Sequence, residues 1–367
     1  MRLALVIERF RPGGGGGESA AWNVAHGLAR AGDEVHVVAR RASESPAVRI
    51  HRVRVPTAWQ PLRVVAFSRA AARAIPRQRV DCVLSFARTL HQNVYRAGGG
   101  SHADYMGRRY GKLERLWRLS PRHAVLLAAE RRIFRDPSQR VVCNSHMVRS
   151  EIQRRYGVPD DRVAVVHNGV DLERFHPRHR AGPGARLRAE LRAGEAPVWL
   201  FCGSGFARKG LDTALRALAR TGAAGAQLWV AGGDEPGRWR RLARRLGVEE
   251  RVRFLGFRRD IATTYAAADA LLLPTRYDAF ANACLEAAAA GLPVVTSGAA
   301  GAAELFRELG GVVEDPEDVA GYAAILDRLA EPGERERWSA AARRVAEAHS
   351  WDGHVAALRE QLRRAAA

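Results

Sequence analysis

Short apolar runs alternate with amphipathic stretches along most of the chain. In the first half, the runs with the length and composition of buried strands are 2–8, 34–39, 48–55, 81–86, 141–145 and 163–168. In the second half, similar runs occur at 198–203, 227–233, 252–256, 270–274, 294–295 and 311–314. Helical periodicity lies between many of these runs, for example over 21–29 and from Thr213 onwards. The alternation predicts an α/β fold with parallel sheets.

The length of the chain indicates how these elements are divided. A chain of 367 residues is too long for one typical core and favours two domains. The first domain is predicted over residues 1–177. A polar stretch with Pro and Gly, 178–184, is predicted as the linker.

The chain is strongly basic. The formal net charge is +20, from 59 Lys and Arg against 39 Asp and Glu. Only two of these basic residues are lysines, Lys112 and Lys209, and such a bias towards arginine is typical of GC-rich coding. Part of the basicity therefore reflects composition. The remainder favours anionic partners, such as a membrane surface, a phosphorylated glycan or nucleic acid.

The N-terminus and the cysteines predict a cytoplasmic protein. The chain begins directly with a strand, so no signal peptide is expected, and no apolar run approaches the roughly 20 residues that span a bilayer. The cysteines include no C-x-x-C pair and lie mostly in apolar runs: Cys82, Cys143, Cys202 and Cys284. We expect reduced core residues rather than disulfides or metal ligands. A peripheral position on the inner face of the cytoplasmic membrane is compatible with the basic charge.

A loop of five glycines, 13–17, follows the first predicted strand. It does not form G-x-G-x-x-G, because Glu18 occupies the last position, and the second strand ends in Arg40-Arg41 rather than in an acid for a ribose. A dinucleotide site is therefore not expected. The loop either allows a ligand to approach the backbone closely or is a flexible connection.

The most informative stretch is 274–293, PTRYDAFANACLEAAAAGLP, which has the pattern loop and helix between two strands. The helix N-terminus in such a unit lies at the carboxyl edge of the sheet and offers amides to an anion. Asp278 precedes those amides, and Glu286 follows within the helix. The two carboxylates would flank a phosphate-sized site and accept hydrogen bonds from hydroxyls, as a nucleotide sugar requires. The alternative is an ordinary α/β turn with a solvated Asp278.

This stretch resembles the signature of retaining GT-B glycosyltransferases of family 4. Asp278 stands where glutamate is usual, Ala279 and Ala281 stand where glycines are frequent, and Glu286 and Gly-Leu-Pro-Val-Val match. The resemblance implies two facing Rossmann-like, doubly wound domains, the second over residues 185–345. It also implies a C-terminal helix, within 346–367, that packs back on the first domain.

The resemblance implies an activity and a site. A hexose, expected to be glucose from UDP-glucose, moves with retention to a glycan acceptor that is lipid-linked, in the manner of the lipopolysaccharide-core branch. The implied catalytic residues are Arg208, Lys209 and Asp278. The implied donor-binding residues are Gly14, Gly15, Gly203, Arg208, Lys209, Phe257, Asp278, Ala279, Phe280, Ala281, Asn282 and Glu286. On the acceptor side the resemblance implies Glu18 and His102. Phe257 is equally compatible with a place in the core.

Composition gives independent weight to Lys209. With two lysines among 59 basic residues, a lysine at this position is improbable by chance. The resemblance implies that Lys209 meets the donor diphosphate, as a compact charge, with Arg208 as the second candidate. Ser204 stands where many members of the family have an arginine.

The segment from Asn93 to Ala103, NVYRAGGGSHA, resembles the lipopolysaccharide-core branch of family 4. Gly99 stands where some relatives have an acid. His102 is either a partner for a sugar hydroxyl or a structural residue. The basic segment that follows, 105–135, includes Trp117 and suits an anionic membrane surface or a solvated helix face.

No D-x-D sequence and no cluster of metal ligands occurs, so no metal or other cofactor is expected beside the nucleotide-sugar co-substrate. Positive side chains and helix dipoles would then neutralise the diphosphate. Nucleic acid is not favoured as a partner. Two other classes stay open: another GT-B enzyme, such as a nucleotide-sugar epimerase, and a non-enzymatic binder of anionic membrane or nucleic acid.

Overall fold

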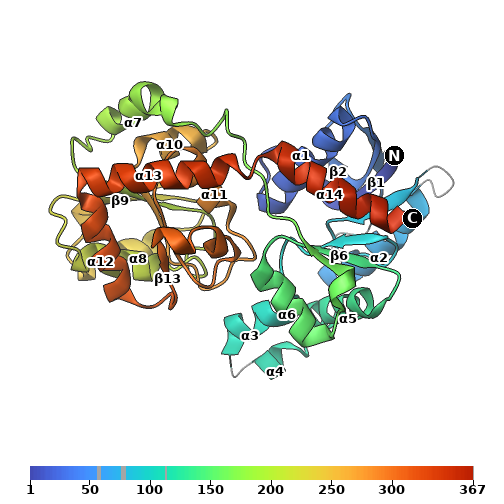
Figure 1. The fold of residues 1–367 in the computed structure, drawn as a ribbon. Coiled ribbons are helices and arrows are strands. Elements are labelled where there is room, and N and C mark those ends of the chain that lie inside the picture. The colour runs from blue at the N-terminus through green and yellow to red at the C-terminus, as the bar shows by residue number, and fades with distance from the viewer. Residues whose placement is uncertain (56–58, 76–79, 112–113, 367) are drawn as a thin grey trace. The chain divides into compact units, whose positions relative to one another are not determined.

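The protein divides into two compact units, each a doubly wound α/β structure (Figure 1). The computed structural model describes residues 1–55, 59–75, 80–111 and 114–366. The first unit consists of Met1–Gly169 with Trp351–Ala367, and the second of Val170–Ser350.

The first unit is built on a seven-stranded parallel sheet with the order β3-β2-β1-β4-β5-β6-β7. Its strands are β1 (Arg2–Phe10), β2 (Glu34–Ala42), β3 (Arg49–Arg52), β4 (Cys82–Ser85), β5 (Val94–Arg96), β6 (Arg140–Cys143) and β7 (Val163–Val165). Its helices are α1 (Gly16–Arg30), α2 (Gln60–Ala74), α3 (His102–Tyr110), α4 (Glu114–Trp117), α5 (Pro121–Arg135), α6 (His146–Tyr156) and α14 (Trp351–Ala366).

Alternation along β1 separates two layers of the first unit. Leu3 and Leu5 pack on one face with residues of α1 and α14, and Val6 packs on the other face with Phe67 of α2. The C-terminal helix α14 therefore completes the first unit's core, as the sequence predicts.

The second unit has a six-stranded parallel sheet with the order β10-β9-β8-β11-β12-β13. Its strands are β8 (Val198–Cys202), β9 (Gln227–Ala231), β10 (Val252–Gly256), β11 (Ala270–Leu273), β12 (Val294–Ser297) and β13 (Val312–Val313). Its α-helices are α7 (Ala185–Glu190), α8 (Leu211–Arg220), α9 (Gly237–Arg245), α10 (Ile261–Ala267), α11 (Asn282–Ala289), α12 (Val319–Ala330) and α13 (Pro332–Glu347). Large side chains such as Trp199, Trp229 and Tyr265 fill its core.

The two strand orders have the same consequence in each unit. In each sheet the chain first adds two strands towards one edge, β2 and β3 or β9 and β10. It then crosses back and adds the remaining strands towards the other edge, so the direction of winding reverses between β1 and β4 and between β8 and β11. Such switch points at the carboxyl ends of the strands are where open α/β sheets bind ligands.

The predicted linker, 178–184, is wrong. The short helices η3 (Pro177–His179) and η4 (Arg180–Gly184) occupy it and belong to the second unit. Arg180 Nη2 donates to Asp269 Oδ1 at 2.5 Å, and an added Cβ on Gly184 would lie 2.6 Å from the carbonyl oxygen of Ala266. These contacts hold the segment on α10, and the units divide at 169/170 and 350/351 rather than after 177 and before 346.

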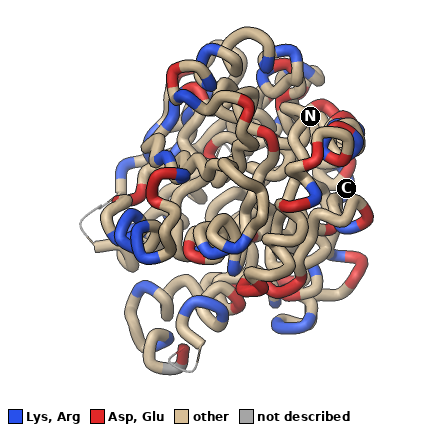
Figure 2. The backbone as a smooth tube through the Cα atoms, turned by 90° about the vertical axis from the view of Figure 1, so that its left-hand side faces the viewer, with Lys and Arg blue, Asp and Glu red and all other residues tan. Residues whose placement is uncertain are grey.

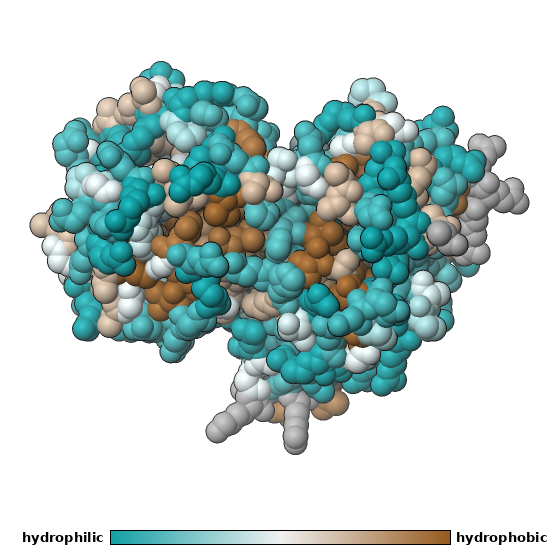
Figure 3. Space-filling model, viewed as in Figure 1, coloured by the Kyte–Doolittle hydropathy of each residue, from teal (hydrophilic) through white to brown (hydrophobic). Residues whose placement is uncertain are grey.

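The distribution of charged and hydrophobic residues bears on possible contact with a membrane. No helix among the described residues is long and apolar enough to cross a membrane. Basic positions are spread over much of the backbone and interleaved with acidic ones (Figure 2). On the face in view, hydrophobic residues form separate patches among hydrophilic ones (Figure 3).

A pair of glycine substitutions tests how closely the loops after β8 and β11 pack. We expect Gly247→Ala to lower the free energy of unfolding by about 1–2 kcal/mol, because its φ of +71° disfavours a Cβ that otherwise meets nothing within 4 Å. Gly210→Ala should cost at least about 2 kcal/mol more, because its Cβ would also lie 1.9 Å from the Pro274 carbonyl oxygen. Urea unfolding of both variants measures the difference, and equal losses would contradict this packing.

Candidate functional site

The loops that follow β8 and β11 meet at the switch point of the second sheet. β8 is the neighbour of both β9 and β11, so the loops 203–210 and 274–281 leave adjacent strands at the carboxyl edge. The predicted donor-binding residues of the second half lie on these loops or at the first residue of α11, except Phe257 and Glu286.

Hydrogen bonds shape the loop 203–210. The Asp234 carboxylate, just beyond β9, accepts the amides of Gly205 at 2.8 Å and Phe206 at 2.9 Å. The amide of Lys209 donates to the Gly205 carbonyl at 2.9 Å and closes a single turn before α8. An added Cβ on Gly203 would lie 3.3 Å from Lys209 Cε, so this predicted glycine lines the lysine side chain.

Arg276 joins this loop to the next one. Its amide donates to the Arg208 carbonyl at 2.8 Å, and its Nη1 donates to the Ala207 carbonyl at 2.8 Å. The same guanidinium forms a bidentate ion pair with Asp212, with both distances 2.8 Å. One residue of the loop 274–281 therefore holds both the loop 203–210 and the start of α8.

The three predicted catalytic residues are in direct contact. Lys209 Nζ donates to Asp278 Oδ2 at 2.6 Å, and Arg208 Nη1 donates to the same oxygen at 3.1 Å. The Lys209 side chain is 9% exposed, whereas that of Arg208 is 34% exposed. The cluster combines two cations with one carboxylate and keeps a net positive charge.

Opposing effects act on the pKa of Asp278. Burial alone would raise this pKa, but the charges of Lys209 and Arg208 and the hydrogen bonds from both lower it well below its usual range. Asp278 is therefore a carboxylate throughout the neutral pH range and cannot serve there as a proton donor.

The second oxygen of Asp278 is also engaged. Asp278 Oδ1 accepts the amides of Phe280 at 3.2 Å and Ala281 at 2.7 Å. These amides immediately precede α11, so the carboxylate lies at the positive end of the helix. A substrate hydroxyl would have to share or replace one of these donors.

Ala281 adopts a conformation that explains why glycine is frequent here in the family. Its φ is 68° and its ψ is 72°, in the left-handed region. A residue with a Cβ pays about 1–2 kcal/mol in this region. Ala279, the other position where the family often has glycine, is not among the residues with positive φ.

Glu286 lies within α11 and is half-buried. Tyr265 Oη donates to Glu286 Oε2 at 3.0 Å. Burial raises the pKa of Glu286, although Tyr265, Arg174 and Lys209 act in the opposite direction. Among the described residues Oε1 has no hydrogen-bond partner, and it is the acceptor that a ligand hydroxyl can use.

The remaining second-half predictions separate into exposed and buried positions. Phe257 follows β10 directly and is 70% exposed, which excludes its alternative place in the core. Phe280 is 2% exposed and packs in the core cluster of the second unit, and Ala279 is buried as well. Asn282 is the first residue of α11 and is half-buried.

In the first unit, the predicted residues Gly14, Gly15 and Glu18 lie at the turn from β1 to α1. Arg11 Nε donates to Glu18 Oε2 at 2.5 Å. An added Cβ on Gly14 would lie 2.0 Å from Glu18 Oε2, whereas one on Gly15 would meet nothing within 4 Å. Gly14 thus makes room for an ion pair, and the backbone is open at Gly15.

The structure places His102 in a buried network. Its amide donates to Glu130 Oε1 at 2.6 Å, and its Nε2 shares a hydrogen bond with His123 Nδ1 at 2.9 Å. The fully buried Glu130 also accepts from Arg88 Nε at 3.0 Å. Burial, with Arg88 and His123, lowers the pKa of His102 to about 3, so the ring is neutral near pH 7. These contacts favour the structural alternative, and an acceptor role stays a prediction.

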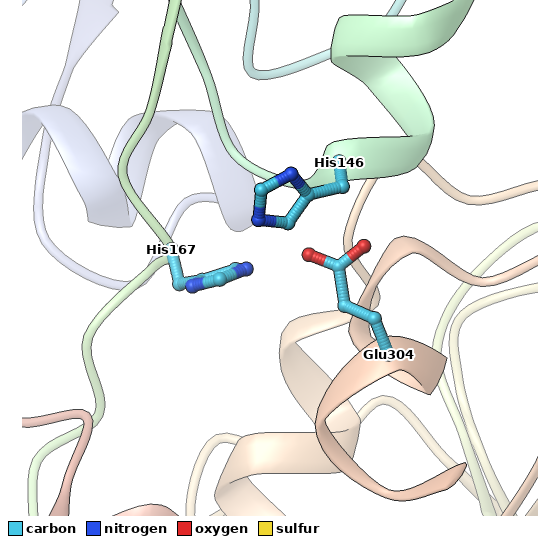
Figure 4. A group of neighbouring side chains, drawn as sticks. All are labelled: His146, His167 and Glu304. Carbon is cyan, nitrogen blue, oxygen red and sulfur yellow. The ribbon is translucent and has the colours of Figure 1, made fainter.

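A second pair of histidines lies at the carboxyl edge of the same sheet. His146 begins α6 just beyond β6, and His167 follows β7. Their ring centroids are 5.9 Å apart, and the rings are tilted by 58° (Figure 4). Neither residue was predicted from the sequence.

Three residues that shape this site in the second unit were also not predicted as site residues: Asp234, Tyr265 and Arg276. Asp234 had a usable signal, because it directly follows a predicted strand that ends in two glycines. Arg276 lies inside the stretch 274–293 but is one arginine among many. Tyr265 meets Glu286 only in the folded chain.

Comparison with known proteins places the chain in a family. Residues 14–174 match the family described as Glycosyltransferase Family 4, and residues 196–332 match that described as Glycosyl transferases group 1. A D-inositol 3-phosphate glycosyltransferase of Thermomonospora curvata is 34% identical over 260 residues, which cover 66% of this chain and 60% of that protein. The chain thus matches less than two thirds of that relative. A probable transglycosylase of Burkholderia thailandensis is 32% identical over 322 residues, covering 86% of this chain and 82% of the relative.

Solved structures agree on the architecture. The crystal structure of WaaG, a glycosyltransferase involved in lipopolysaccharide biosynthesis, has a TM-score of 0.85 at 24% identity, covering 98% of this chain and 99% of that one. HepE of Anabaena in complex with UDP-glucose has a TM-score of 0.74 at 19% identity, covering 99% and 100%. At these identities the likeness establishes the fold. The chain belongs to glycosyltransferase family 4 and has the GT-B fold.

Proposed function

We propose that this member of glycosyltransferase family 4 is an active glycosyltransferase, which transfers a hexose from a nucleoside diphosphate sugar, with UDP-glucose as the expected donor, to a glycan acceptor. The observation that carries the proposal is the contact of Lys209 and Arg208 with Asp278 at the switch point of the second sheet. Two cations in a mostly buried site exceed the charge of one carboxylate there, and a diphosphate would balance the excess. The HepE structure with UDP-glucose supports this choice of donor.

The donor would extend from this cluster in two directions. Glu286 Oε1 would accept a hydrogen bond from a ribose or sugar hydroxyl, and the exposed ring of Phe257 would contact the nucleobase. Gly203 and the amides near Ala281 would let the diphosphate approach the backbone and the positive end of α11.

The proposed chemistry retains the anomeric configuration. The acceptor hydroxyl oxygen attacks the anomeric carbon on the face from which the diphosphate departs. The bond from that carbon to the phosphate oxygen breaks, and the proton of the hydroxyl passes to the departing oxygen. No enzymic base is required, because the leaving group takes the proton. Lys209 and Arg208 would stabilise the negative charge that grows on the diphosphate in the transition state.

The acceptor is proposed to be a lipid-linked glycan, as in the lipopolysaccharide core. WaaG, which shares this fold, is a glycosyltransferase involved in lipopolysaccharide biosynthesis, and this likeness supports the choice of acceptor class. An exposed apolar surface on the first unit supports contact with a membrane. The surface contains three exposed side chains: Leu116 (67% exposed), Trp117 (45%) and Leu119 (80%). The ring of Trp117 stacks on that of Tyr110, with the ring centroids 4.7 Å apart. Aromatic and aliphatic side chains beside basic ones suit the interfacial region of an anionic bilayer.

Thermal melting with a panel of nucleotide sugars tests the donor assignment. A ligand that binds only the folded state raises the melting temperature, and UDP-glucose should do so where uridine does not. Product analysis then tests the reaction: transfer requires an acceptor, whereas consumption of the donor without an acceptor would indicate an epimerase or hydrolase. A chain that binds no nucleotide sugar contradicts the proposal.

Lys209→Ala should lower kcat more than it raises KM for the donor. The charge on the diphosphate grows in the transition state, so the lost contact should cost about 2–4 kcal/mol, or roughly 10²–10³-fold in turnover. Arg216→Ala, which removes an exposed cation from α8, is the matched control and should leave kcat unchanged. A turnover number of Lys209→Ala within threefold of that of the unmodified protein would contradict the role of Lys209 in stabilising the departing diphosphate.

Transfer activity should persist in EDTA. Under the proposal Lys209, Arg208 and the end of α11 neutralise the diphosphate, so a chelator removes nothing that the reaction needs. Initial rates are compared in EDTA, in Mg²⁺ and in Mn²⁺. Loss of activity in EDTA and its recovery on adding either ion would count against metal independence.

The membrane proposal is tested by flotation with vesicles that contain anionic lipid. Leu116→Ser with Leu119→Ser should reduce vesicle binding by about tenfold or more, because two exposed apolar side chains are lost. Leu62→Ser, which changes a leucine that is 47% exposed on α2, is the control. Arg108 and Arg118 are already paired with Glu151 and Glu114, and Lys112 lies outside the described residues, so the leucines are the sharper probe. Equal binding by the double variant and the unmodified protein would refute this surface.

A further inference from the structure

Three charged side chains extend the layer between α2 and the first sheet towards the carboxyl edge. Glu8 lies two residues beyond Val6, and Arg40 lies two residues beyond Val38, so each continues the α2-facing row of its strand. Arg63 lies one turn before Phe67 on the same face of α2. The apolar members of these rows pack in one core cluster: Val6, Val38 and Phe67. The two arginines and the glutamate therefore meet where this core ends.

The two arginines are poorly satisfied by the glutamate. Arg63 Nε is 3.6 Å from Glu8 Oε2, and Arg40 Nη2 is 4.0 Å from the same oxygen. Both distances exceed those of a good hydrogen bond. The Nε atoms of Arg40 and Arg63 are buried and have no hydrogen-bond partner among the described residues. The Arg40 side chain is only 8% exposed, and a buried guanidinium donor without an acceptor is costly.

The surrounding charge makes this shortage larger. Burial lowers the pKa of Arg40, and the charges of Arg41, Arg63 and Arg9 lower it further, against the single opposing effect of Glu8. Arg9 and Arg41 are partners in the register of β1 and β2. Three guanidiniums therefore disfavour the charge of Arg40, and one carboxylate favours it.

The nearby acids do not relieve the excess. Glu18, in the first turn of α1, is paired with Arg11 at 2.5 Å, and Glu44, just beyond β2, is paired with Arg52 at 2.5 Å. Glu8 and Arg40 lie near the carboxyl ends of β1 and β2. This is the edge of the sheet from which the glycine loop leaves and at which open α/β sheets bind ligands.

We propose that Arg40 and Arg63 form a binding site for a phosphate monoester, and that this phosphate belongs to the acceptor glycan. The guanidinium fork matches phosphate oxygens in a bidentate manner. A phosphate monoester carries close to two negative charges at neutral pH, so it balances the excess better than a carboxylate does. The assignment to the acceptor rests on the proposed function, whereas the phosphate site itself stands on the geometry of the first unit.

Inorganic phosphate is the probe for the site. Its binding is measured on the whole chain by calorimetry and by thermal melting, at constant ionic strength, with acetate as the carboxylate arm. Arg63→Gln and Arg40→Gln are compared with Arg73→Gln, which removes an exposed arginine from the same helix as Arg63. The general stabilising effect of phosphate on folded proteins is the same in all variants and is subtracted.

We expect phosphate to bind and acetate not to bind. Arg63→Gln and Arg40→Gln should each weaken phosphate binding by about tenfold or more, whereas Arg73→Gln should not. Without phosphate, the melting temperatures of the two site variants should stay equal or rise, because each change removes a repelled, unsatisfied cation. If the arginines serve only to pair with Glu8, both variants melt lower and keep the affinity of the unmodified chain for phosphate. That result, or no phosphate binding by the unmodified chain, overturns the proposal, and acetate binding as tight as phosphate overturns the choice of a phosphate.

A parallel melt with UDP-glucose separates this inference from the proposed function. Arg63→Gln should keep the full protection by UDP-glucose, because Arg63 lies in the first unit and the proposed donor site lies in the second. If the chain binds phosphate at Arg63 but binds no nucleotide sugar, the result supports the anion site and contradicts the donor assignment. A transfer assay completes the test, with the acceptor used before and after treatment with phosphatase. For the unmodified enzyme, the treatment should raise the KM for the acceptor at least about tenfold. For Arg63→Gln, the treatment should leave the KM for the acceptor unchanged. An equal effect of phosphatase on both enzymes would remove the acceptor assignment.

Discussion

The second unit's site depends on the contact between the Lys209 ammonium and the Asp278 carboxylate. At 2.6 Å it joins loops from two adjacent parallel strands, and Arg208 adds a second cation to the same oxygen. The other oxygen of Asp278 holds the amides that precede α11. One carboxylate therefore sets the positions of both cations and of the helix end. The proposed diphosphate would enter a site whose charges are already placed, which is the condition for electrostatic catalysis without reorganisation.

The two units differ in how closely their clustered cations are paired with a carboxylate. In the second, the cations Lys209 and Arg208 are within hydrogen-bond distance of their carboxylate. In the first, Arg40 and Arg63 stand 4.0 and 3.6 Å from Glu8 and leave buried donors unsatisfied. A tightly paired cluster is stable when empty, whereas a loosely paired one gains more from an anion. This difference suits the proposed donor site, which is assembled in advance, and the proposed anion site, which a ligand completes.

Much of this architecture is predictable because strands buried on both faces leave a strong signal. Apolar runs located each strand in the described part of the chain except the short β5, whose three residues end in the buried Arg96. Lys209 could be singled out because a lysine is so rare in this chain. The linker was misread because polar residues and glycines at 178–184 look like a loop until Arg180 finds Asp269. Contacts of that kind join residues far apart in sequence, and no local pattern reports them.

The same limit applies to the roles of single residues. The sequence left His102 between two interpretations, and the choice depends on Arg88, His123 and Glu130, which meet only in the folded first unit. The pairing of Asp278 with both cations was likewise invisible, although its place before α11 was predicted.

A crystal structure of the chain with UDP would show whether Lys209 and Arg208 bind the diphosphate of the donor. We expect an oxygen of the diphosphate to lie within hydrogen-bond distance of Lys209 Nζ and of the Arg208 guanidinium, beside the N-terminus of α11. A diphosphate bound elsewhere, with Lys209 still paired only to Asp278, would contradict it.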